Sequence, residues 1–433
     1  MARVLQSLRR VLGLTPPRPS QTFARSIDTD FFRFREGDRV ILHGKTPILT
    51  KPLQKNHKTD LSRGYLPHES IIGQKARSRV QAHKGTDYRV THPTFEEYVS
   101  LTPRLVTPIY GPDAELIVSL LDIHVAPPAE GDDLPPLEIL ESGTGHGSLT
   151  LHLSRAIQAA NPCPPAIPPS SQIKYLQGRP QRPDERKDQT DKKDEQSQKS
   201  DTSNTAEKET TPPSSDPLQE QWDAWRSQRR AVIHTVDVSP SFSARAEKTV
   251  RGFRRGLYAG NVDFYVGHAE NWIAEQIRQR TPKTLLTKPT VEPFLTHAIL
   301  DMPSAHQRIP HVAPILKPNG ILAVFMPSIT QIGECVDLIR KQNLPFSLDR
   351  VVELGAGISG GRQWDVRFAV KKSRADPSSW TADDADAVAV QTPPREETPR
   401  DDGVLVCRPK VGARIVGGGF VGIWRRFEDT QKR

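Results

Sequence analysis

The sequence has few cysteines and no long apolar run, and both shortages narrow the class of protein. Its three cysteines, Cys163, Cys335 and Cys407, are too few and too scattered for a disulfide framework or a zinc knuckle. We therefore expect a reducing compartment and no structural metal. No apolar stretch approaches the roughly 18 residues needed to cross a bilayer, so no membrane span is expected. Apolar residues make up only 35% of the chain and prolines number 39, so part of it is expected to stay unpacked.

Acidic residues are missing from the first 27 positions, which contain five arginines. Leu5, Leu8 and Leu12 fall on one face of a helix, with arginines opposite. This pattern is typical of a mitochondrial transit peptide, so we predict a leader over residues 1–27 and a mitochondrial location, with the nucleus as the alternative. The same segment could instead be a basic tail that helps to bind RNA. The net charge of +9 also fits an anionic partner, nucleic acid first.

The rest of the chain reads as a small β module, an α/β region and two polar interruptions. Short alternating segments bounded by turn residues predict the β module. Alternating strand and helix patterns then predict a mainly parallel sheet covered on both faces, and Asp113 is placed to cap an apolar helix that runs through Leu121. The two interruptions lose the pattern and are predicted to be disordered insertions. The predicted boundaries are 28–92 for the β domain, 93–160 and 222–372 for the α/β domain, 161–221 and 373–403 for the insertions, 404–427 for the last strand and 428–433 for a tail.

The most informative stretch is "LEILESGTGHGSLTLHLSRAI", an apolar strand, a glycine-rich turn and an amphipathic helix. No lysine follows the glycines, which excludes a phosphate-cradling Walker loop, and the glycine spacing departs from the dinucleotide pattern. The acid Glu141 ends the strand and would repel a pyrophosphate, but it could pair with a cationic amino-acid moiety. Gly143 and Gly145 would let a ligand lie against the turn.

A second acid, Asp237, ends the next predicted strand in "AVIHTVDVS". At the carboxyl edge of a parallel sheet, its carboxylate could hold both hydroxyls of a ribose. The glycine-rich turn and this acid together suit S-adenosylmethionine, whereas a tight connection is the alternative for a glycine-rich turn taken alone.

The target side of the predicted site is "ILDMPSAH", where Asp301 ends a buried strand and Pro303 stops it. Aminomethyltransferases that act on bases place an acid or amide and a proline at such a corner. The side chain accepts a hydrogen bond from the exocyclic amine and aligns the ring nitrogen with the methyl group. A strand-terminal aspartate that caps a helix is the alternative interpretation.

These segments, taken in order, resemble the tRNA (adenine, N1) methyltransferases that modify the T-loop adenosine at position 58. "IYGPDA" followed by "ESGTGHGSLT" is more specific than either motif alone. The resemblance implies an α/β fold: a Rossmann-like class I methyltransferase domain with a mainly parallel seven-stranded sheet, and a small N-terminal β domain. The matching segments are "EGDRVILHG", "SRGYLPHESIIG", "RVTHPTFEEYVSLTPRLVTPIYGPDAELIVSLLDI", "ILESGTGHGSLTLHLSRAI", "DMPSAHQRIPHVAPILKPNGILAVFMPSITQI" and "RQWDVRF".

The resemblance also implies S-adenosylmethionine as cofactor, no metal, and a set of site residues. Asp301 and Tyr110 would be catalytic, with the Tyr110 ring stacking beside the target base, although a core-packing tyrosine is the alternative. The implied cofactor-binding residues are Glu141, Ser142, Gly143, Thr144, Gly145 and Ser148 for the methionine end, Asp237 for the ribose, His268, Ala269 and Glu270 for the adenine, and Asp301.

By the same resemblance the partner is tRNA, and the assembly is a homotetramer or a hetero-oligomer with a non-catalytic sister subunit. The β module would add tRNA-binding surface, although a solvated charged face explains each basic residue equally well. The basic residues concerned are Arg63, His68, Arg79, His83, Lys84 and Arg89.

The chain departs from the family pattern before its last strand. The family often carries a Gly-His-Thr-Gly type stretch there, whereas this chain has only Gly417–Gly419, so any contact from a histidine or threonine at that corner is lost or moved. Two other functions stay open: a catalytically silent, tRNA-binding partner subunit, and a methyltransferase with another target, such as a different RNA or protein isoaspartate.

Overall fold

The structure is a computed structural model, and its described residues fall into two units. Residues 26–355 and 418–428 belong to the first unit and 364–369 and 404–409 to the second. Within the first unit, 106–108, 128–134, 177–215 and 282–290 lie outside the described residues. The predicted leader up to residue 25, the insertion 373–403 and the tail from residue 429 also lie outside them. The described part contains no helix long and apolar enough to span a membrane.

The amino-terminal module is a small antiparallel β structure, as expected. One sheet has the strand order β2-β1-β6-β5. Strands β3 and β4, which come between β2 and β5 in the chain, pair with each other as a separate hairpin. Alternation places Val80, Tyr88 and Val90 in a small core, whereas Arg79 and Arg89 point to solvent. The strands are β1 Ile41–His43, β2 Ile48–Leu49, β3 Lys58–Leu61, β4 Gly64–Pro67, β5 Arg79–Gln81 and β6 Asp87–Thr91.

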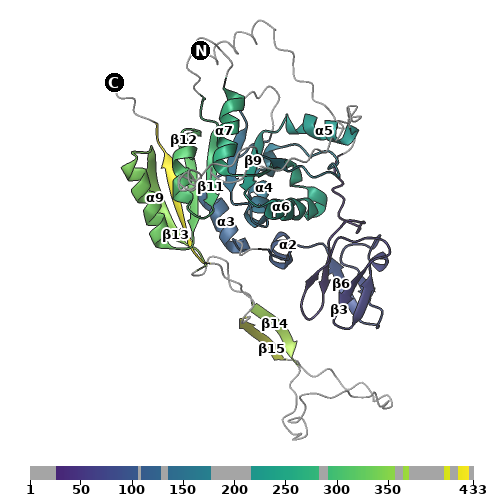
Figure 1. The fold of residues 1–433 in the computed structure, drawn as a ribbon. Helices are drawn as coiled ribbons and strands as arrows, with labels where there is room; N and C mark the ends of the chain where they lie inside the picture. Colours follow the sequence, from purple (N-terminus) through teal and green to yellow (C-terminus); the bar gives the residue numbers. More distant parts are fainter. Residues whose placement is uncertain are drawn as a thin grey trace, which may run out of the picture. The chain divides into compact units, whose positions relative to one another are not determined.

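A large, mostly parallel sheet forms the centre of the first unit (Figure 1). Its order is β13-β16-β12-β11-β7-β9-β10-β8, and only β16 runs antiparallel, to both of its neighbours β12 and β13. Because β7, β9, β10 and β11 are parallel neighbours, their carboxyl ends meet at one edge. The strands are β7 Leu137–Ser142, β8 Lys174–Tyr175, β9 Ala231–Asp237, β10 Val262–Val266, β11 Leu295–Asp301, β12 Leu316–Met326, β13 Phe346–Glu353 and β16 Phe420–Arg426.

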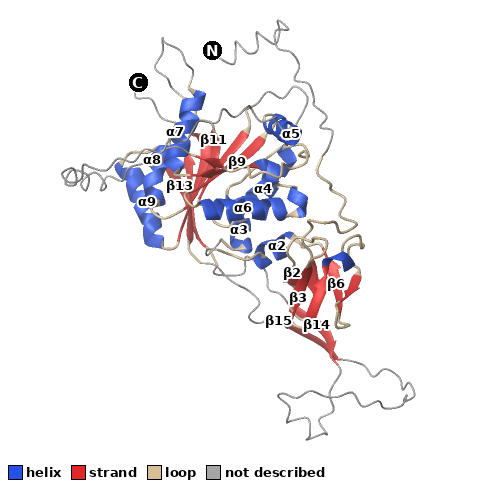
Figure 2. Cartoon of the chain, turned by 45° about the vertical axis from the view of Figure 1, so that its right-hand side comes forward, coloured by secondary structure: helices blue, strands red, loops and turns tan. Residues whose placement is uncertain are grey.

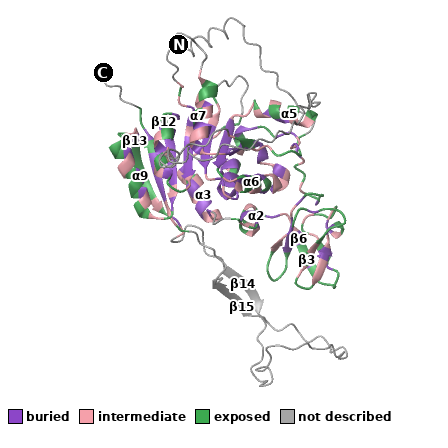
Figure 3. Ribbon diagram, viewed as in Figure 1, coloured by how far each residue is buried: buried purple, intermediate pink, exposed green. Residues whose placement is uncertain are grey.

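Helices cover both faces of this sheet, and burial alternates along the strands accordingly (Figure 2). Ile139 joins the core cluster that contains buried residues of α3, α4 and α6, whereas the next residue, Leu140, joins the cluster that contains those of α7, α8 and α9. The central strands are therefore buried on both sides (Figure 3). The helices are α2 Phe95–Leu101, α3 Gly111–Leu120, α4 Ser148–Ile157, α5 Pro217–Arg226, α6 Pro240–Gly252, α7 Ala269–Arg280, α8 Ile309–Val312 and α9 Ile329–Lys341.

The structure differs from the prediction at both ends of the first insertion. Residues 161–176 pack against the fold and supply β8, the eighth strand of the sheet, which pairs with β10. Helix α5 begins at Pro217, where Asp216 caps it and Trp222 and Trp225 are buried. Because the middle of this segment contains few apolar residues, the sequence did not indicate that its two ends pack against the domain. Only residues 177–215 of the predicted insertion lie outside the description.

Two further boundaries need correction. β14 Trp364–Ala369 and β15 Val404–Pro409 pair with each other as an antiparallel two-stranded sheet in the second unit, so neither belongs to the large sheet. The last strand of the large sheet is β16 alone, not the whole of 404–427. At the other end, Ile27 is buried and its amide donates to the carbonyl of Pro164, although the leader was predicted to include it.

Candidate functional site

The turn after β7 lies against the end of β11, and this contact explains its first glycine. Gly143 has a φ of +100°, and a Cβ at this position would lie 1.8 Å from the carbonyl oxygen of Asp301. Every other residue would clash with this backbone as well as adopt a strained conformation. The Gly143 amide donates to the Val236 carbonyl at 2.9 Å, which fixes the turn to β9. The predicted turn and the predicted Asp301 corner are therefore adjacent.

Asp237 ends β9 and holds the same turn through hydrogen bonds. Its two carboxylate oxygens accept from the amide of Gly145 at 3.1 Å and from the amide of Ser239 at 2.8 Å. Burial raises the pKa of Asp237, and these bonds act in the opposite direction. Each oxygen has a second lone pair, so the carboxylate can still accept hydrogen bonds from a ligand.

Glu141 lies beneath the turn and is fully buried. One carboxylate oxygen accepts from the Thr150 hydroxyl of α4 at 2.7 Å, and among the described residues the other has no hydrogen-bond partner. Burial raises the pKa of Glu141 to about 8, and the charges of Asp301 and Asp237 act in the same direction. The structure thus places this side chain as a support below the turn.

Asp301 ends β11 and is partly buried at the same edge. Burial, together with the charge of Asp237, raises the pKa of Asp301 to about 7. Two residues further on, Pro303 leads into Ser304, which has a φ of +56° and precedes a short turn of helix. Asp301 is therefore not a helix-capping residue, since Ser304 occupies the N-cap position and makes no side-chain cap.

The three acids form an edge that is short of positive charge. The charges of Asp301 and Asp237 help to raise the pKa of Glu141, and the charge of Asp237 helps to raise the pKa of Asp301. In the part of the chain that the structure describes, none of the three forms an ion pair with a lysine, arginine or histidine. A group of carboxylates without a cation is costly to bury, and a positively charged ligand would relieve that cost. No group of metal-ligating side chains occurs among the described residues.

The remaining polar residues of the turn point to different partners. The Thr144 hydroxyl lies 2.7 Å from that of Thr235 on β9. The Ser142 hydroxyl donates to the Met302 sulfur at 3.0 Å, and the Ser148 hydroxyl is buried with no described partner. Of these three hydroxyl groups, that of Ser148 is the one without a hydrogen-bond partner among the described residues.

The predicted adenine-binding residues follow β10 at the start of α7. The amide of Gly267 donates to the Asp237 carbonyl at 2.9 Å, which brings this loop to the acid edge. His268 is the N-cap residue, and Ala269 is buried. Glu270 is engaged elsewhere, since one of its oxygens lies 2.9 Å from the guanidinium of Arg308.

Tyr110 lies at the start of α3, where it is the N-cap residue. The guanidinium of Arg104 lies 4.6 Å from the centre of its ring. Burial, and then the charges of Arg104 and Arg245, lower the pKa of His146 in the glycine-rich turn to about 4. Arg104 thus lies near both Tyr110 and the turn. Asp113, predicted as the cap, lies instead in the first turn and accepts from the amide of Gly355 at 3.2 Å, so that prediction was wrong.

Sequence reasoning missed the residues that support the site. Thr150 and Thr235 hold polar groups beneath the turn, and Arg104 and Arg245 carry positive charge beside it. Thr150 was visible in the sequence as the threonine of "GSLT". The two arginines gave no signal, because their closeness depends on how α2, α3 and α6 pack.

One predicted RNA contact is contradicted in the β module. His68 is buried, its Nδ1 accepts from the Gln54 amide at 3.0 Å, and its Nε2 lies 3.0 Å from the Thr59 hydroxyl. Burial lowers the pKa of His68, so this residue is a structural, uncharged histidine and not a phosphate ligand. The exposed members of the predicted set are Arg63, Arg79, His83, Lys84 and Arg89.

The order and direction of the strands define a class I methyltransferase fold with a small antiparallel β domain before it. A solved SAM-dependent O-methyltransferase of Thermotoga maritima superimposes with a TM-score of 0.51, covering 93% of this chain and 97% of that one at 13% identity. The predicted fold class is confirmed, with eight described strands in place of seven.

The chain is also distantly related to tRNA methyltransferases. It is 24% identical over 320 residues to the tRNA (adenine(58)-N(1))-methyltransferase of Thermus thermophilus, covering 74% of this chain and 84% of that protein. It is 31% identical over 153 residues to the catalytic subunit of the corresponding enzyme of Cryptococcus neoformans, covering 34% of this chain and 30% of that subunit. No protein-family model matches the chain.

Proposed function

We propose that this protein is an S-adenosylmethionine-dependent tRNA methyltransferase that forms N1-methyladenosine at position 58 of the T-loop. The observation that carries the proposal is the acid edge formed by Glu141, Asp237 and Asp301 beside a glycine-rich turn. The distant relatives named as tRNA (adenine(58)-N(1))-methyltransferases support the choice of target.

S-adenosylmethionine fits the chemistry of this edge. It carries an ammonium and a sulfonium, both positive, and the edge offers the carboxylates of Asp237 and Asp301, neither with a basic partner among the described residues. Asp237 would accept from the ribose hydroxyls, and the free hydroxyl of Ser148 would reach the methionine end. When bound, the cofactor supplies the methyl group as an electrophile. His268 and Ala269 are the residues we assign to the adenine.

Asp301 would hold the target adenine by its exocyclic amine. For this it must be ionised, because only the carboxylate accepts from that amine with both oxygens. N1 of adenine is unprotonated at neutral pH, so little general-base catalysis is needed. The ring becomes positive as the methyl arrives, and a carboxylate at this position stabilises that charge. Tyr110 would support the ring by stacking.

The test is methyl transfer to an unmodified tRNA transcript by the purified full chain. We expect N1-methyladenosine in the digested product, and none from a transcript with guanosine at position 58. Methylation of that control transcript at another base, or of ribosomal RNA or protein instead, would identify another target. No transfer to any of them, with tRNA still bound, would indicate the silent partner subunit.

We also propose a mitochondrial location, with the nucleus as the alternative, and an assembly that is a homotetramer or a hetero-oligomer with a sister subunit. Comparing tRNA methylation in the two compartments of a deletion strain tests the location. Light scattering of the purified chain tests the assembly, since a monomer that gains activity only with a second subunit would exclude the homotetramer.

A further inference from the structure

The eighth strand of the large sheet brings a leucine to the loop that we assign to the adenine of the cofactor. β8 pairs in parallel with the end of β10, where Tyr175 lies opposite Val266. The next residue, Leu176, extends this ladder, because its amide donates to the Val266 carbonyl at 2.9 Å. The chain is therefore held up to the point where β10 ends and the adenine loop, residues 267–269, begins.

Leu176 packs directly on Gly267, the first residue of the adenine loop. A Cβ at Gly267 would lie 2.8 Å from the Cβ of Leu176 and 2.9 Å from its Cδ1, much closer than two carbon atoms normally approach. Only a glycine lets the leucine side chain lie against the backbone here. Leu176 is partly buried and also packs against the core cluster that contains the buried residues of α7, α8 and α9. The side chain thus joins the loop to the core.

A second contact joins the adenine loop to the acid edge. The Gly267 amide donates to the Asp237 carbonyl at 2.9 Å. His268 is then the N-cap residue of α7, and Ala269 is its buried first residue. The first N–H groups of a helix have no acceptor within it, so the start of α7 can donate to a ring nitrogen of adenine. Whether it does so with good geometry depends on how firmly the preceding glycine is held.

The segment that carries Leu176 is itself anchored to two helices. The Glu247 carboxylate of α6 accepts from the Ser171 hydroxyl and from the Gln172 amide, both at 2.7 Å. The side-chain amides of Gln172 and of Gln219 on α5 bond to each other at 2.9 and 3.1 Å. A binding loop is held precisely only when its supporting residues are themselves fixed. The anchored segment meets this condition.

We propose that Leu176 is a positioning residue for the adenine of S-adenosylmethionine, because its contact with Gly267 fixes the loop that receives the ring. Leu176 acts through the loop and does not touch the reacting atoms. The strand that carries it, β8, is additional to the seven strands expected for the fold, so this chain has added a support to its cofactor site. The proposal rests on the proposed assignment of His268 and Ala269 to the adenine.

The test measures how well the full chain distinguishes S-adenosylhomocysteine from S-inosylhomocysteine, in which hypoxanthine replaces adenine. N1 of adenine accepts a hydrogen bond, whereas N1 of hypoxanthine carries a proton, so a donor in the loop favours adenine. In Leu176→Ala the affinity for S-adenosylhomocysteine should fall about three- to tenfold, because one hydrogen bond is weakened. The affinity for the inosine compound should fall less. Calorimetric titration measures both.

Three further variants separate this role from a general loss of stability. Leu176→Met keeps the volume of the side chain and should keep the wild-type ratio of the two affinities. Tyr175→Ala is the matched control, because it truncates the neighbouring, exposed side chain of the same strand, and it should also keep the ratio. If Leu176→Ala does not fold, Leu176→Val replaces it, since valine lacks the Cδ1 contact but suits a strand.

Amide hydrogen exchange locates the effect within the chain. Residues 267–269 should exchange faster in Leu176→Ala than in the wild type, and at the wild-type rate in Tyr175→Ala. A folded Leu176→Ala with the wild-type ratio of affinities overturns the proposal. An equal fall in both affinities also overturns it, because it indicates only a general loss of stability.

The assumptions behind the proposal are tested by the same measurements. A wild type that does not prefer the adenine compound overturns both the role of Leu176 and the assignment of the loop. If Leu176 controls the ratio of affinities but the wild type transfers no methyl group to tRNA, the positioning role stands and the proposed tRNA methyltransferase function fails.

Discussion

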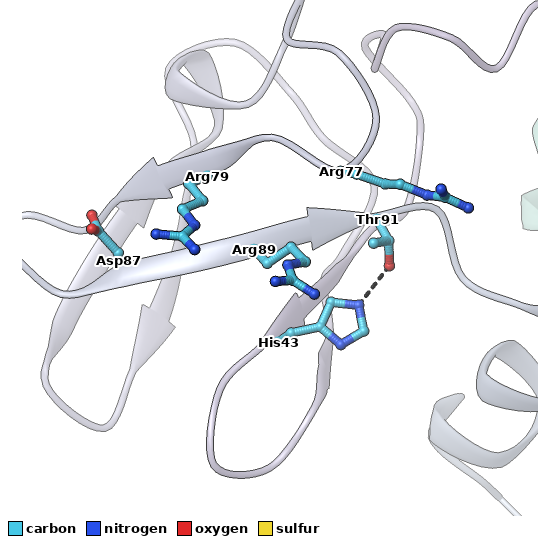
Figure 4. A pocket seen from close by; sticks show the side chains of 6 residues that line it. All are labelled: His43, Arg77, Arg79, Asp87, Arg89 and Thr91. Carbon is cyan, nitrogen blue, oxygen red and sulfur yellow. Dashed lines mark hydrogen bonds between the residues drawn. The ribbon is translucent and has the colours of Figure 1, made fainter. Parts of the chain in front are cut away.

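The acid edge of the large sheet is one of two regions where like charges gather. The other is a row of basic side chains across β1, β6 and β5 of the β module, the cationic row of His43, Arg89 and Arg79 (Figure 4). The two present the same physical problem with opposite signs. At the edge, Glu141, Asp237 and Asp301 gather without a basic partner among the described residues. In the row, Arg79 and Arg89 face each other without an acid. Each region is less stable than a neutral version would be, and each would be relieved by a ligand of opposite charge.

The two regions differ in burial, and this decides how each should respond to its surroundings. The acid edge is buried, so the cost of holding its carboxylates together appears as raised pKa values of these groups. Stability and activity that depend on the edge should therefore change with pH. The row is exposed, so ions in solution screen it over about 8–10 Å at physiological salt, and it should respond to ionic strength. The comparison therefore predicts pH dependence for one site and salt dependence for the other.

The largest effect is expected at the target side of the acid edge. Asp301→Ala should lower turnover by about 100-fold or more, because both alignment of the base and stabilisation of its developing charge are lost. Cofactor affinity should fall much less than turnover. The measurement is single-turnover methyl transfer with saturating cofactor, and Asp337→Asn, an exposed acid of α9, is the matched control. Equal rates in the Asp301→Ala variant and the wild type would show that Asp301 does not act on the target base.

The glycine-rich turn at Gly143 should also be sensitive to substitution, in this case through the stability of the fold. Gly143→Ala combines a φ of +100° with a contact of 1.8 Å to the backbone of Asp301, so we expect a loss of roughly 3 kcal/mol or more in the free energy of unfolding. Urea unfolding measures it. Gly333→Ala is the control: it lies in α9 with nothing within 4 Å of the added Cβ, and should stabilise the chain by about 0.5–1 kcal/mol.

Activity should depend on pH through Asp301. Since burial raises its pKa to about 7, the carboxylate form needed by the proposed mechanism is lost as the pH falls below 7. We expect kcat/KM to rise with pH and to level off above an apparent pKa near 7. In the Asp301→Asn variant, the residual kcat/KM should no longer rise with pH in this range. A flat profile in the wild type between pH 5.5 and about 8.5 would contradict the assignment.

A smaller effect concerns the stability of the unliganded protein. Glu141 has a pKa of about 8 in the folded chain and 4.5 as the ordinary value. A carboxyl with a raised pKa favours folding while protonated, so this contribution is complete below pH 4.5 and is lost as the pH rises through 8. The unfolding temperature should therefore decline over this window. Glu141→Gln should lessen the decline; if it makes the decline steeper, Glu141 is not the group responsible.

The sequence predicted those parts of the site that depend on local pattern. The strand–turn–helix around Gly143 and the acids that end β9 and β11 each follow from one short segment, and parallel strands bring their ends together. The family resemblance implied that the large sheet would have seven strands. Neither the sequence nor the resemblance indicated β8, because its two residues, Lys174 and Tyr175, are both exposed and form a strand only by pairing with β10.

Other features depended on packing between distant segments. Glu141 was expected to face a ligand, yet its carboxylate reaches Thr150, which depends on how α4 lies on the sheet. His68 was predicted to be a basic residue of the RNA-binding surface. It is instead buried, and its ring is hydrogen-bonded to residues of two other segments. The cationic row needed the register of β1, β5 and β6, which no single segment encodes.

The most direct test of the account is calorimetric titration of the full-length chain with S-adenosylmethionine, beside the variant Asp237→Ala. We expect one saturable binding event for the wild type. In the variant the affinity should be lower by a factor of about ten or more, because a charged hydrogen-bond acceptor for the ribose is lost. Urea unfolding of both proteins shows whether the variant is folded. A wild-type chain that is folded but gives no heat of binding would contradict the central claim that the acid edge holds this cofactor.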